Sequence, residues 1–315
     1  MINAIQFQKG LSLAQFLAQY GTEAQCEEHL KRLRWPHTYC CPKCHHRCAS
    51  LFRRHSQLYW QCKHCQYQCS LRAGTLMQHS HLPLSTWFLV IYLVTQSKNN
   101  LAALALRRQL GISWHAAWLL KHKLMEAMRQ REASSPLQGD VQVDDAYLGG
   151  KKHGDPGGRT NKTPFVAAVQ MNEGRPQRVR FDVVAGFSLD SMRCWAEQAL
   201  APGSRIVSDG LAGFHVFERM GFEHTVYVTS KAQAGEQVQA LRWLNVVLSN
   251  LKTALSGTHH AFKFAKYAAR YLAQAQYRFN RRADLAAMVP RLAVAVMQTK
   301  PCPRWRITCP TEGKT

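Results

Sequence analysis

The spacing of apolar residues divides the chain into a helical part and a part with strands. From residue 101 the sequence reads LAALALRRQLGISWHAAWLLKHKLMEAM, in which one amphipathic stretch stops at Gly111 and another starts after Ser113. After residue 139 come short runs such as RVRFDVVA at 178–185, where apolar and polar residues alternate. Such alternation is typical of strands. The pattern therefore predicts helices first and a mixed α/β region second.

The α/β region is expected to hold five strands and at least two helices. The strand-like runs lie at 141–150, 164–171, 178–185, 205–210 and 225–229, and the helical runs at 191–200 and about 233–255. Three successive short strands predict an antiparallel meander, and the order becomes βββ-α-β-α-β-α. In the last helix an apolar stripe is formed by Leu244, Val247, Leu248, Leu251 and Leu255.

Breakers and composition divide the chain further. The expected parts are a helical lead (1–36), a Cys/His-rich part (37–81), a helical segment resembling a helix-turn-helix (82–135), the α/β region (136–290) and a basic C-terminal tail (291–315). Ser85 is the expected N-cap of the first helix after the Cys/His-rich part. If this segment is a helix-turn-helix, its second helix, which carries Lys121, His122 and Lys123, would lie in the major groove of DNA. Trp114 and Trp118 share a face, which favours core packing.

Charge changes the picture more than length does. The chain has 315 residues, 46% of them hydrophobic, and a formal net charge of +22. A chain this basic calls for a polyanionic partner, with nucleic acid first and a membrane surface second. The longest apolar run, at 87–94, is much shorter than the ~20 residues that span a bilayer. The first residues lack the features of a signal peptide, so we expect a cytoplasmic protein that associates with the nucleoid.

Four cysteines have the spacing of a zinc site. Cys41 and Cys44 form one C-x2-C pair, Cys62 and Cys65 form another, and seventeen residues separate the pairs. Two such pairs complete a tetrahedral, closed site, so a structural Zn²⁺ is predicted. Spare thiols and imidazoles nearby leave the ligand assignment open; they are Cys40, Cys48, Cys69, His45, His46 and His64. The basic residues of this part (Arg47, Arg53, Arg54, Lys63 and Arg72) suggest a surface for DNA or RNA.

Two aspartates and one helix carry the candidate chemistry. Asp144 lies in the first predicted strand and Asp209 just after the fourth, while Asn245 and Lys252 align on one side of the apolar stripe. Phosphodiester cleavage by a metal pair needs oxygen ligands that converge from separate elements. On spacing alone these four could also be ordinary solvated residues.

Longer motifs resemble a known family. They are RWPHTYCCPKC, WQCKHCQYQCSLRAGTLM with LPLSTWF, VDDAYLGGK, SDGLAGF and the block starting NVVLSNLKTALSGTHHAFKF. Over nearly the whole chain, the sequence resembles insertion-sequence transposases that have an N-terminal zinc ribbon and an RNase H-like catalytic domain of the DDE class. The resemblance implies Asp144, Asp209 and Asn245 as ligands of Mg²⁺ or Mn²⁺, with Lys252 as the basic residue after them.

The chain departs from the family pattern at two points. The third ligand is Asn245, whose neutral amide is a weaker ligand than a carboxylate. His45 stands where Gly is more usual after the second cysteine. Asp145 remains an alternative to Asp144, because the alternation of the strand does not decide between them, and Glu236 is a less suitable substitute for Asn245.

The resemblance also implies partners. Double-stranded DNA, both transposon ends and target, would be held by basic residues of the last block: Lys263, Lys266, Arg270, Arg278, Arg281 and Arg282. The interleaved tyrosines favour core packing, and the Gly-rich loop 149–162 could reach a groove. We expect a DNA transposase that binds terminal inverted repeats, cleaves and joins strands, acts as a homo-oligomer and needs no membrane. A zinc-ribbon DNA-binding protein without catalysis is the alternative, and a nuclease that cuts without joining is a third.

Overall fold

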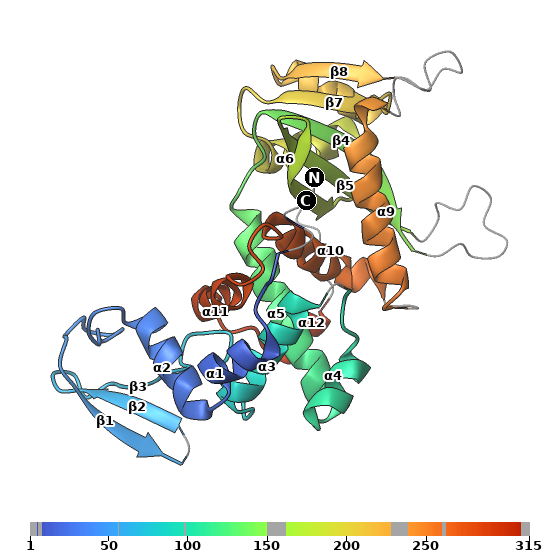
Figure 1. Cartoon of the computed structure of the whole chain (residues 1–315). Coiled ribbons are helices and arrows are strands. Elements are labelled where there is room, and N and C mark those ends of the chain that lie inside the picture. Colours follow the sequence, from blue (N-terminus) through green and yellow to red (C-terminus); the bar gives the residue numbers. More distant parts are fainter. Residues whose placement is uncertain are drawn as a thin grey trace. The chain divides into compact units, whose positions relative to one another are not determined.

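The computed structural model describes residue 5 and residues 8–55, 57–97, 99–149, 162–227, 239–259 and 263–309. The chain forms two compact units, one of residues 1–127 with 283–307 and the other of residues 128–282 with 308–315 (Figure 1). Among the described residues, no helix has both the length and the apolar character needed to cross a membrane.

The first unit combines helices with a small sheet. Its helices are α1 (Leu13–Tyr20), α2 (Glu23–Arg34), α3 (Leu84–Gln96), α4 (Ala103–Leu110), most of α5 (Trp114–Ala133), α11 (Met288–Gln298) and α12 (Arg304–Thr308). The sheet is antiparallel, in the order β1 (Ala49–Arg54), β2 (Gln57–Cys62) and β3 (Gln68–Ser70). Ser12 and Thr22 each close a capping box at the start of α1 and α2, which explains why the helical lead is readable in the sequence.

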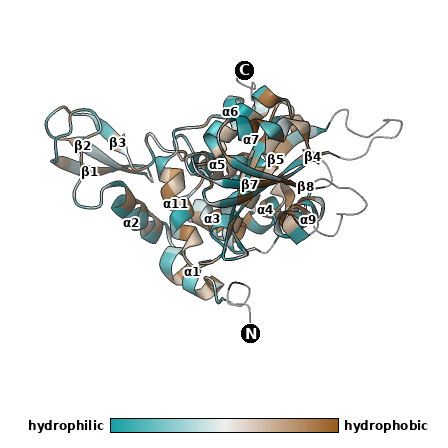
Figure 2. Ribbon diagram, turned by 90° about the horizontal axis from the view of Figure 1, so that it is seen from above, coloured by the Kyte–Doolittle hydropathy of each residue, from teal (hydrophilic) through white to brown (hydrophobic). Residues whose placement is uncertain are grey.

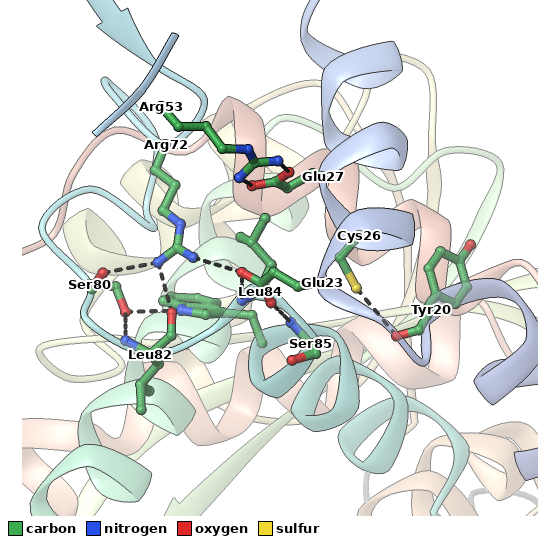
Figure 3. A network of polar contacts seen from close by, with 11 residues as sticks. Tyr20, Glu23, Cys26, Glu27, Arg53, Arg72, Ser80, Leu82, Leu84 and Ser85 are labelled. Carbon is green, nitrogen blue, oxygen red and sulfur yellow. Dashed lines mark hydrogen bonds and ion pairs between the residues drawn. The ribbon is translucent and has the colours of Figure 1, made fainter. Parts of the chain in front are cut away.

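Helix α3 is capped from another helix. It begins at Leu84, without a side-chain cap of its own. The Glu23 carboxylate of α2 accepts hydrogen bonds from the backbone N–H groups of Leu84 (2.8 Å) and Ser85 (2.9 Å) (Figure 3). The expected N-cap Ser85 is therefore a helical residue, and a carboxylate distant in sequence takes its role.

The turn between α4 and α5 forms as predicted. Gly111 adopts the left-handed conformation (φ 65°), and the Ser113 side chain accepts from the backbone N–H of Ala116. The next basic residues of α5 are not exposed, however: Lys121, His122 and Lys123 are all buried. The Lys123 ammonium donates to the backbone carbonyl of Leu76. Trp114, expected in the core, is 44% exposed.

The second unit is built on a five-stranded mixed sheet. Its strands are β4 (Asp140–Leu148), β5 (Thr163–Asn172), β6 (Arg175–Val183), β7 (Arg205–Asp209) and β8 (Glu223–Tyr227), in the order β6-β5-β4-β7-β8. The first three form the predicted antiparallel meander, and β4 pairs with β7 in parallel. Its other elements are α6 (Leu189–Ala199), the short helices 212–215 and α7 (Val216–Arg219), α9 (Arg242–Ser256) and α10 (Phe264–Asn280). This confirms the α/β class and the order of elements.

Helices cover the two faces of this sheet. Val141 and Val143 of β4 pack into a buried cluster with Met192 and Trp195 of α6. Gln142, which points the other way, bonds the backbone carbonyl of Ala240 and the N–H of Leu244 at the start of α9. The predicted stripe of α9 is buried in full, and Figure 2 shows both hydrophilic and hydrophobic positions on this helix.

Helix α10 covers the edge strand β6. The amide side chain of Asn280 pairs with both the N–H and the carbonyl of Val179, and the Gln276 amide accepts from the N–H of Phe181. Such pairing satisfies backbone groups that an edge strand would otherwise expose.

The C-terminal region is more ordered than its composition suggests. Residues 291–308, expected in a basic tail, include most of α11 and all of α12. Buried residues of α11 are Met288, Val289, Leu292, Ala293, Ala295 and Val296. Their helical spacing outweighs the basic residues around them, so this segment belongs to the core of the first unit.

Candidate functional site

The strand register brings the two predicted aspartates together. Val143 of β4 pairs with Ser208 of the parallel strand β7, so Asp144 and Asp209, the next residues of each strand, lie side by side. Asp209 is the last residue of β7, and its carboxylate accepts from the backbone N–H of Leu211 (3.2 Å). Parallel pairing thus places the end of β7 beside the middle of β4 and creates the acidic site.

Three carboxylates converge at this edge. Carboxylate oxygens of Asp144, Asp145 and Asp209 all lie within 4.8 Å of one another. Burial, followed by the charges of Asp209 and Asp145, raises the pKa of Asp144 to about 7. Three close carboxylates form a donor set suited to hard divalent cations.

Helix α9 supplies the other side of the site. An open depression of about 540 Å³ is lined by Asp144, Asp145, Ala146, Tyr147, Lys162, Asn245, Leu248, Ser249, Lys252 and Thr253. Asn245 and Lys252 are exposed, beside the buried stripe of their helix. The structure therefore brings all four sequence-predicted residues to one place and includes Asp145 with them.

Sequence reasoning missed two residues of α9 in this depression. Ser249 and Thr253 follow Asn245 by four and eight residues, so they occupy the same side of the helix. That spacing was a readable signal. Glu236 and residues 150–161 of the Gly-rich loop lie outside the described residues.

A polar chain lies behind Asp209. The Ser208 hydroxyl is 2.8 Å from Nε2 of His224 and donates to the backbone carbonyl of Asp209 (2.9 Å). Glu218 Oε1 is 3.2 Å from Nδ1 of the same imidazole. Ser208 is fully buried, so it is no nucleophile for an external substrate. These contacts fix the backbone at the end of β7 and thereby the position of Asp209.

The six predicted DNA-binding residues occupy different environments. Lys263 is exposed, Lys266 and Arg278 are half-buried, and Arg270 is buried. Arg281 is paired with the buried Glu132 and stacks on Tyr277 (3.7 Å to the ring centroid). Arg282 donates to backbone carbonyls, including that of Phe279 (2.8 Å). Arg281 and Arg282 thus have structural partners within the second unit. Tyr271 and Tyr277 are buried, as core packing requires.

The four predicted zinc ligands form a compact cluster in the first unit. Their sulfur atoms lie within 4.8 Å of one another, with 3.6 Å between Cys41 and Cys65 and 3.5 Å between Cys44 and Cys62. Sulfur atoms around a tetrahedral zinc ion are about 3.8 Å apart, given Zn–S bonds of about 2.3 Å. The cluster therefore fits a structural zinc ion, which would hold the two cysteine turns together.

Both cysteine turns use the same backbone device. His45 (φ 60°) and Gln66 (φ 58°), each directly after the second cysteine of its pair, adopt the left-handed conformation. Their N–H groups bond the carbonyls of Cys41 (2.9 Å) and Cys62 (3.0 Å). The turn forms with histidine where glycine was expected.

The other basic residues of the ribbon divide between structure and surface. Arg53 pairs with Glu27 (2.6 Å), and Arg72 donates to the carbonyls of Ser80 and Leu82 and pairs with Glu23 (Figure 3). These two arginines therefore link the ribbon to the helices of the first unit. Arg47, Arg54 and Lys63 are exposed.

A zinc ribbon followed by an α/β domain with clustered aspartates defines a protein of the DDE transposase class. Residues 21–68 match the transposase zinc-ribbon domain, and residues 136–280 match the ISXO2-like transposase domain. Both matched families are transposase domains, so the chain carries a transposase zinc ribbon and an ISXO2-like transposase domain. The first match starts before α2, so this helix is part of the ribbon domain.

A curated protein of Halobacterium salinarum is also similar. It is described as an uncharacterized protein in transposable element ISH50 and is 27% identical over 133 residues. The aligned part covers 41% of this chain and 43% of that protein, so the chain spans less than half of the length of its relative.

Proposed function

We propose that this protein is a DNA transposase that binds the terminal inverted repeats of its insertion sequence, cleaves the DNA there and joins it to a target. The observation that carries the proposal is the convergence of Asp144, Asp145 and Asp209, with Asn245 and Lys252 on the same depression. The family match over 136–280 supports the class of reaction.

The residues fit a divalent cation. Asp144, Asp209 and Asn245 would hold Mg²⁺ or Mn²⁺, with Asp145 next to them. When bound, the metal would activate the attacking oxygen and stabilise the leaving oxygen. Burial raises the pKa of Asp144 most, and the charges of Asp209 and Asp145 add a repulsion that a bound cation would remove.

The remaining residues would act on the DNA strand. Lys252 is exposed at the rim, and its ammonium would bind a phosphate of the strand in the depression. Ser249 and Thr253 offer hydroxyl groups on the same side. Lys263 and Lys266, at the start of α10, would neutralise phosphates further along the DNA. A homo-oligomer would allow the two ends of the element to be handled together.

The test is a cleavage and joining assay on duplexes that carry the ends of the element. Wild-type protein in Mg²⁺ is expected to nick the end duplex and to join the released 3′-hydroxyl to a target duplex. Asp144→Ala and Asp209→Ala are expected to lose both reactions while still binding DNA. Nicking without joined products would instead indicate a nuclease.

One observation favours a second function. Asn245 contributes a neutral amide where a third carboxylate would bind a metal more strongly. A zinc-ribbon DNA-binding protein without catalysis would bind the end duplex tightly and with strong salt dependence, yet cut nothing in Mg²⁺ or Mn²⁺. Asn245→Glu gives a sharper test, because restored cutting in this variant would identify the amide as the cause.

A further inference from the structure

One face of the ribbon sheet carries a set of side chains that no part of the cleavage site uses. Residues directly opposite each other in an antiparallel sheet project to the same side. The pairs Phe52–Tyr59, Arg54–Gln57 and Tyr59–Ser70 therefore define one face. This face, called the ribbon face below, consists of Ser50, Phe52, Arg54, Gln57, Tyr59, Gln61, Gln68 and Ser70, all exposed or half-buried.

The opposite face is occupied within the first unit. There Arg53 is paired with Glu27 of α2, and Trp60, Cys62 and Cys69 are buried. Trp60 packs on Trp35, with 4.5 Å between the ring centroids. The sheet thus docks onto its own domain by one face, which leaves the ribbon face for a partner.

The ribbon face has a preorganised centre. The rings of Phe52 and Tyr59 are stacked, with centroids 5.5 Å apart. The Arg54 guanidinium lies 5.8 Å and 5.5 Å from these two centroids and donates to the Gln68 amide oxygen (3.1 Å). A guanidinium held over two rings loses little side-chain entropy when it binds a ligand.

The charge around this face identifies the partner as a polyanion. From residue 29 to residue 72, a range that includes the whole ribbon sheet, the sequence contains no Asp or Glu but nine Lys or Arg residues, and Arg47, Arg54 and Lys63 among them are exposed. The ribbon face itself adds three glutamine amides, from Gln57, Gln61 and Gln68, to its arginine. Arginine and glutamine are side chains that bind base edges of guanine and adenine in pairs of hydrogen bonds.

We propose that the ribbon face enters the major groove of duplex DNA and reads base edges in the ends of the element. Three strands about 4.8 Å apart span about 10 Å, which fits a major groove about 12 Å wide. Arg54 and the three glutamines would contact bases, while the Phe52–Tyr59 pair would contact thymine methyl groups or sugars. The choice of DNA as the polyanion rests on the proposed transposase function.

The test measures how well the full-length, zinc-loaded protein distinguishes two labelled duplexes of about 40 base pairs. One duplex carries an end of the element that encodes the protein, and the other has the same composition in scrambled order. Arg54→Ala is expected to lower affinity for the end duplex about tenfold and for the scrambled duplex less than threefold. A triple Gln57→Ala, Gln61→Ala, Gln68→Ala variant should lose preference in the same way without any change of charge.

The charge-matched control is Arg32→Ala. This side chain is 75% exposed on α2. Its loss should therefore lower the affinity for both duplexes equally and by less than threefold. Bound zinc per chain and the thermal transition are measured for each variant to show that the ribbon is intact. Arg54→Lys, which keeps the charge but not the paired hydrogen bonds, should also lose the preference for the end duplex.

Three results would overturn the inference: an unchanged preference in the Arg54 and glutamine variants, equal losses on both duplexes, or tighter face-dependent binding to RNA of the same sequence. The cleavage assay separates this inference from the proposed function. If wild-type protein cuts nothing but Arg54→Ala loses its preference, the transposase proposal fails and the ribbon face stands. If cutting occurs with no role for the face, the reverse holds.

Discussion

The two clusters of candidate metal ligands in this protein differ in how the structure around them tolerates the repulsion between like-charged ligands. The thiols of Cys41, Cys44, Cys62 and Cys65 come from two tight turns on a small sheet. Because four thiols fill the tetrahedral coordination shell of a zinc ion, this site suits a structural ion. The carboxylates of Asp144, Asp145 and Asp209 sit on a five-stranded sheet with its own core, beside an open depression. We therefore expect the ribbon to need its ion in order to fold, and the second unit to fold without one while it holds like charges together at a cost in stability.

Removal of zinc should give the largest effect. Cys62→Ser removes one ligand, and a structural zinc site contributes roughly 10 kcal/mol or more to the folding of a small domain. We expect the β1–β3 sheet to unfold while the sheet of the second unit remains. Hydrogen exchange followed by mass spectrometry measures both regions in one experiment. Equal protection of the β1–β3 sheet in wild type and variant would contradict a structural zinc; Cys48→Ser, an exposed thiol outside the cluster, is the control.

Loss of Asp209 should act on strand cleavage and leave the ribbon and DNA binding unchanged. Asp209→Ala is expected to lower the rate of strand cleavage about a thousandfold or more, because the ligand set loses one of its carboxylates. The hydrogen-exchange protection of the ribbon and the affinity for the end duplex should stay within threefold of wild type. Asp190→Ala, an exposed aspartate of α6, is the matched control. Undiminished cleavage in Asp209→Ala would place the reaction elsewhere.

Asp144→Asn should stabilise the metal-free protein. Burial and two neighbouring carboxylates raise the pKa of Asp144 to about 7 from an ordinary value near 3.8. A raised carboxyl pKa destabilises the folded state progressively as pH rises from about 4 to about 7, and the full loss persists above that range. The variant should therefore be more stable by about 4 kcal/mol at pH 8 and little changed at pH 4.

That measurement needs a buffer without added divalent cations and without chelator, so that the ribbon retains its zinc. Added Mg²⁺ should reduce the difference in the free energy of unfolding, because it stabilises the wild-type protein more than the variant. Denaturant unfolding of the second unit at several pH values gives the free energies. A difference that does not depend on pH would show that burial and the neighbouring carboxylates do not raise the pKa of Asp144 as the structure implies.

The two clusters also differ in how far the sequence could predict them. The ribbon ligands lie within 25 residues, from 41 to 65, so their spacing alone identified the site. The strands, the meander and the stripe of α9 were also readable, because each depends on local periodicity. Asp144 and Asp209 were candidates because of their places in the predicted strands, but only the resemblance assigned them to one site, since nothing local indicates that β4 and β7 are neighbours.

Contacts between distant segments were beyond the sequence. The cap that Glu23 places on α3, and the burial of Lys121 to Lys123, depend on tertiary packing. The ordered helices after residue 287 and the pairing of Arg281 with Glu132 have the same origin. Lys121 to Lys123 and Arg281 were interpreted as DNA-binding residues, whereas the fold buries the first group and pairs Arg281 with Glu132.

The smallest effect should come from the backbone of the cysteine turns. His45 and Gln66 adopt left-handed conformations, which cost a residue with a side chain about 1 kcal/mol relative to glycine. His45→Gly and Gln66→Gly should each stabilise the zinc-bound ribbon by up to about 1 kcal/mol, offset in part by greater freedom in the unfolded chain. Lys63→Gly, in the same turn but without a positive φ, should destabilise it. Competition for zinc with a coloured chelator measures these differences, and weaker zinc retention in His45→Gly would show that the imidazole itself supports the site.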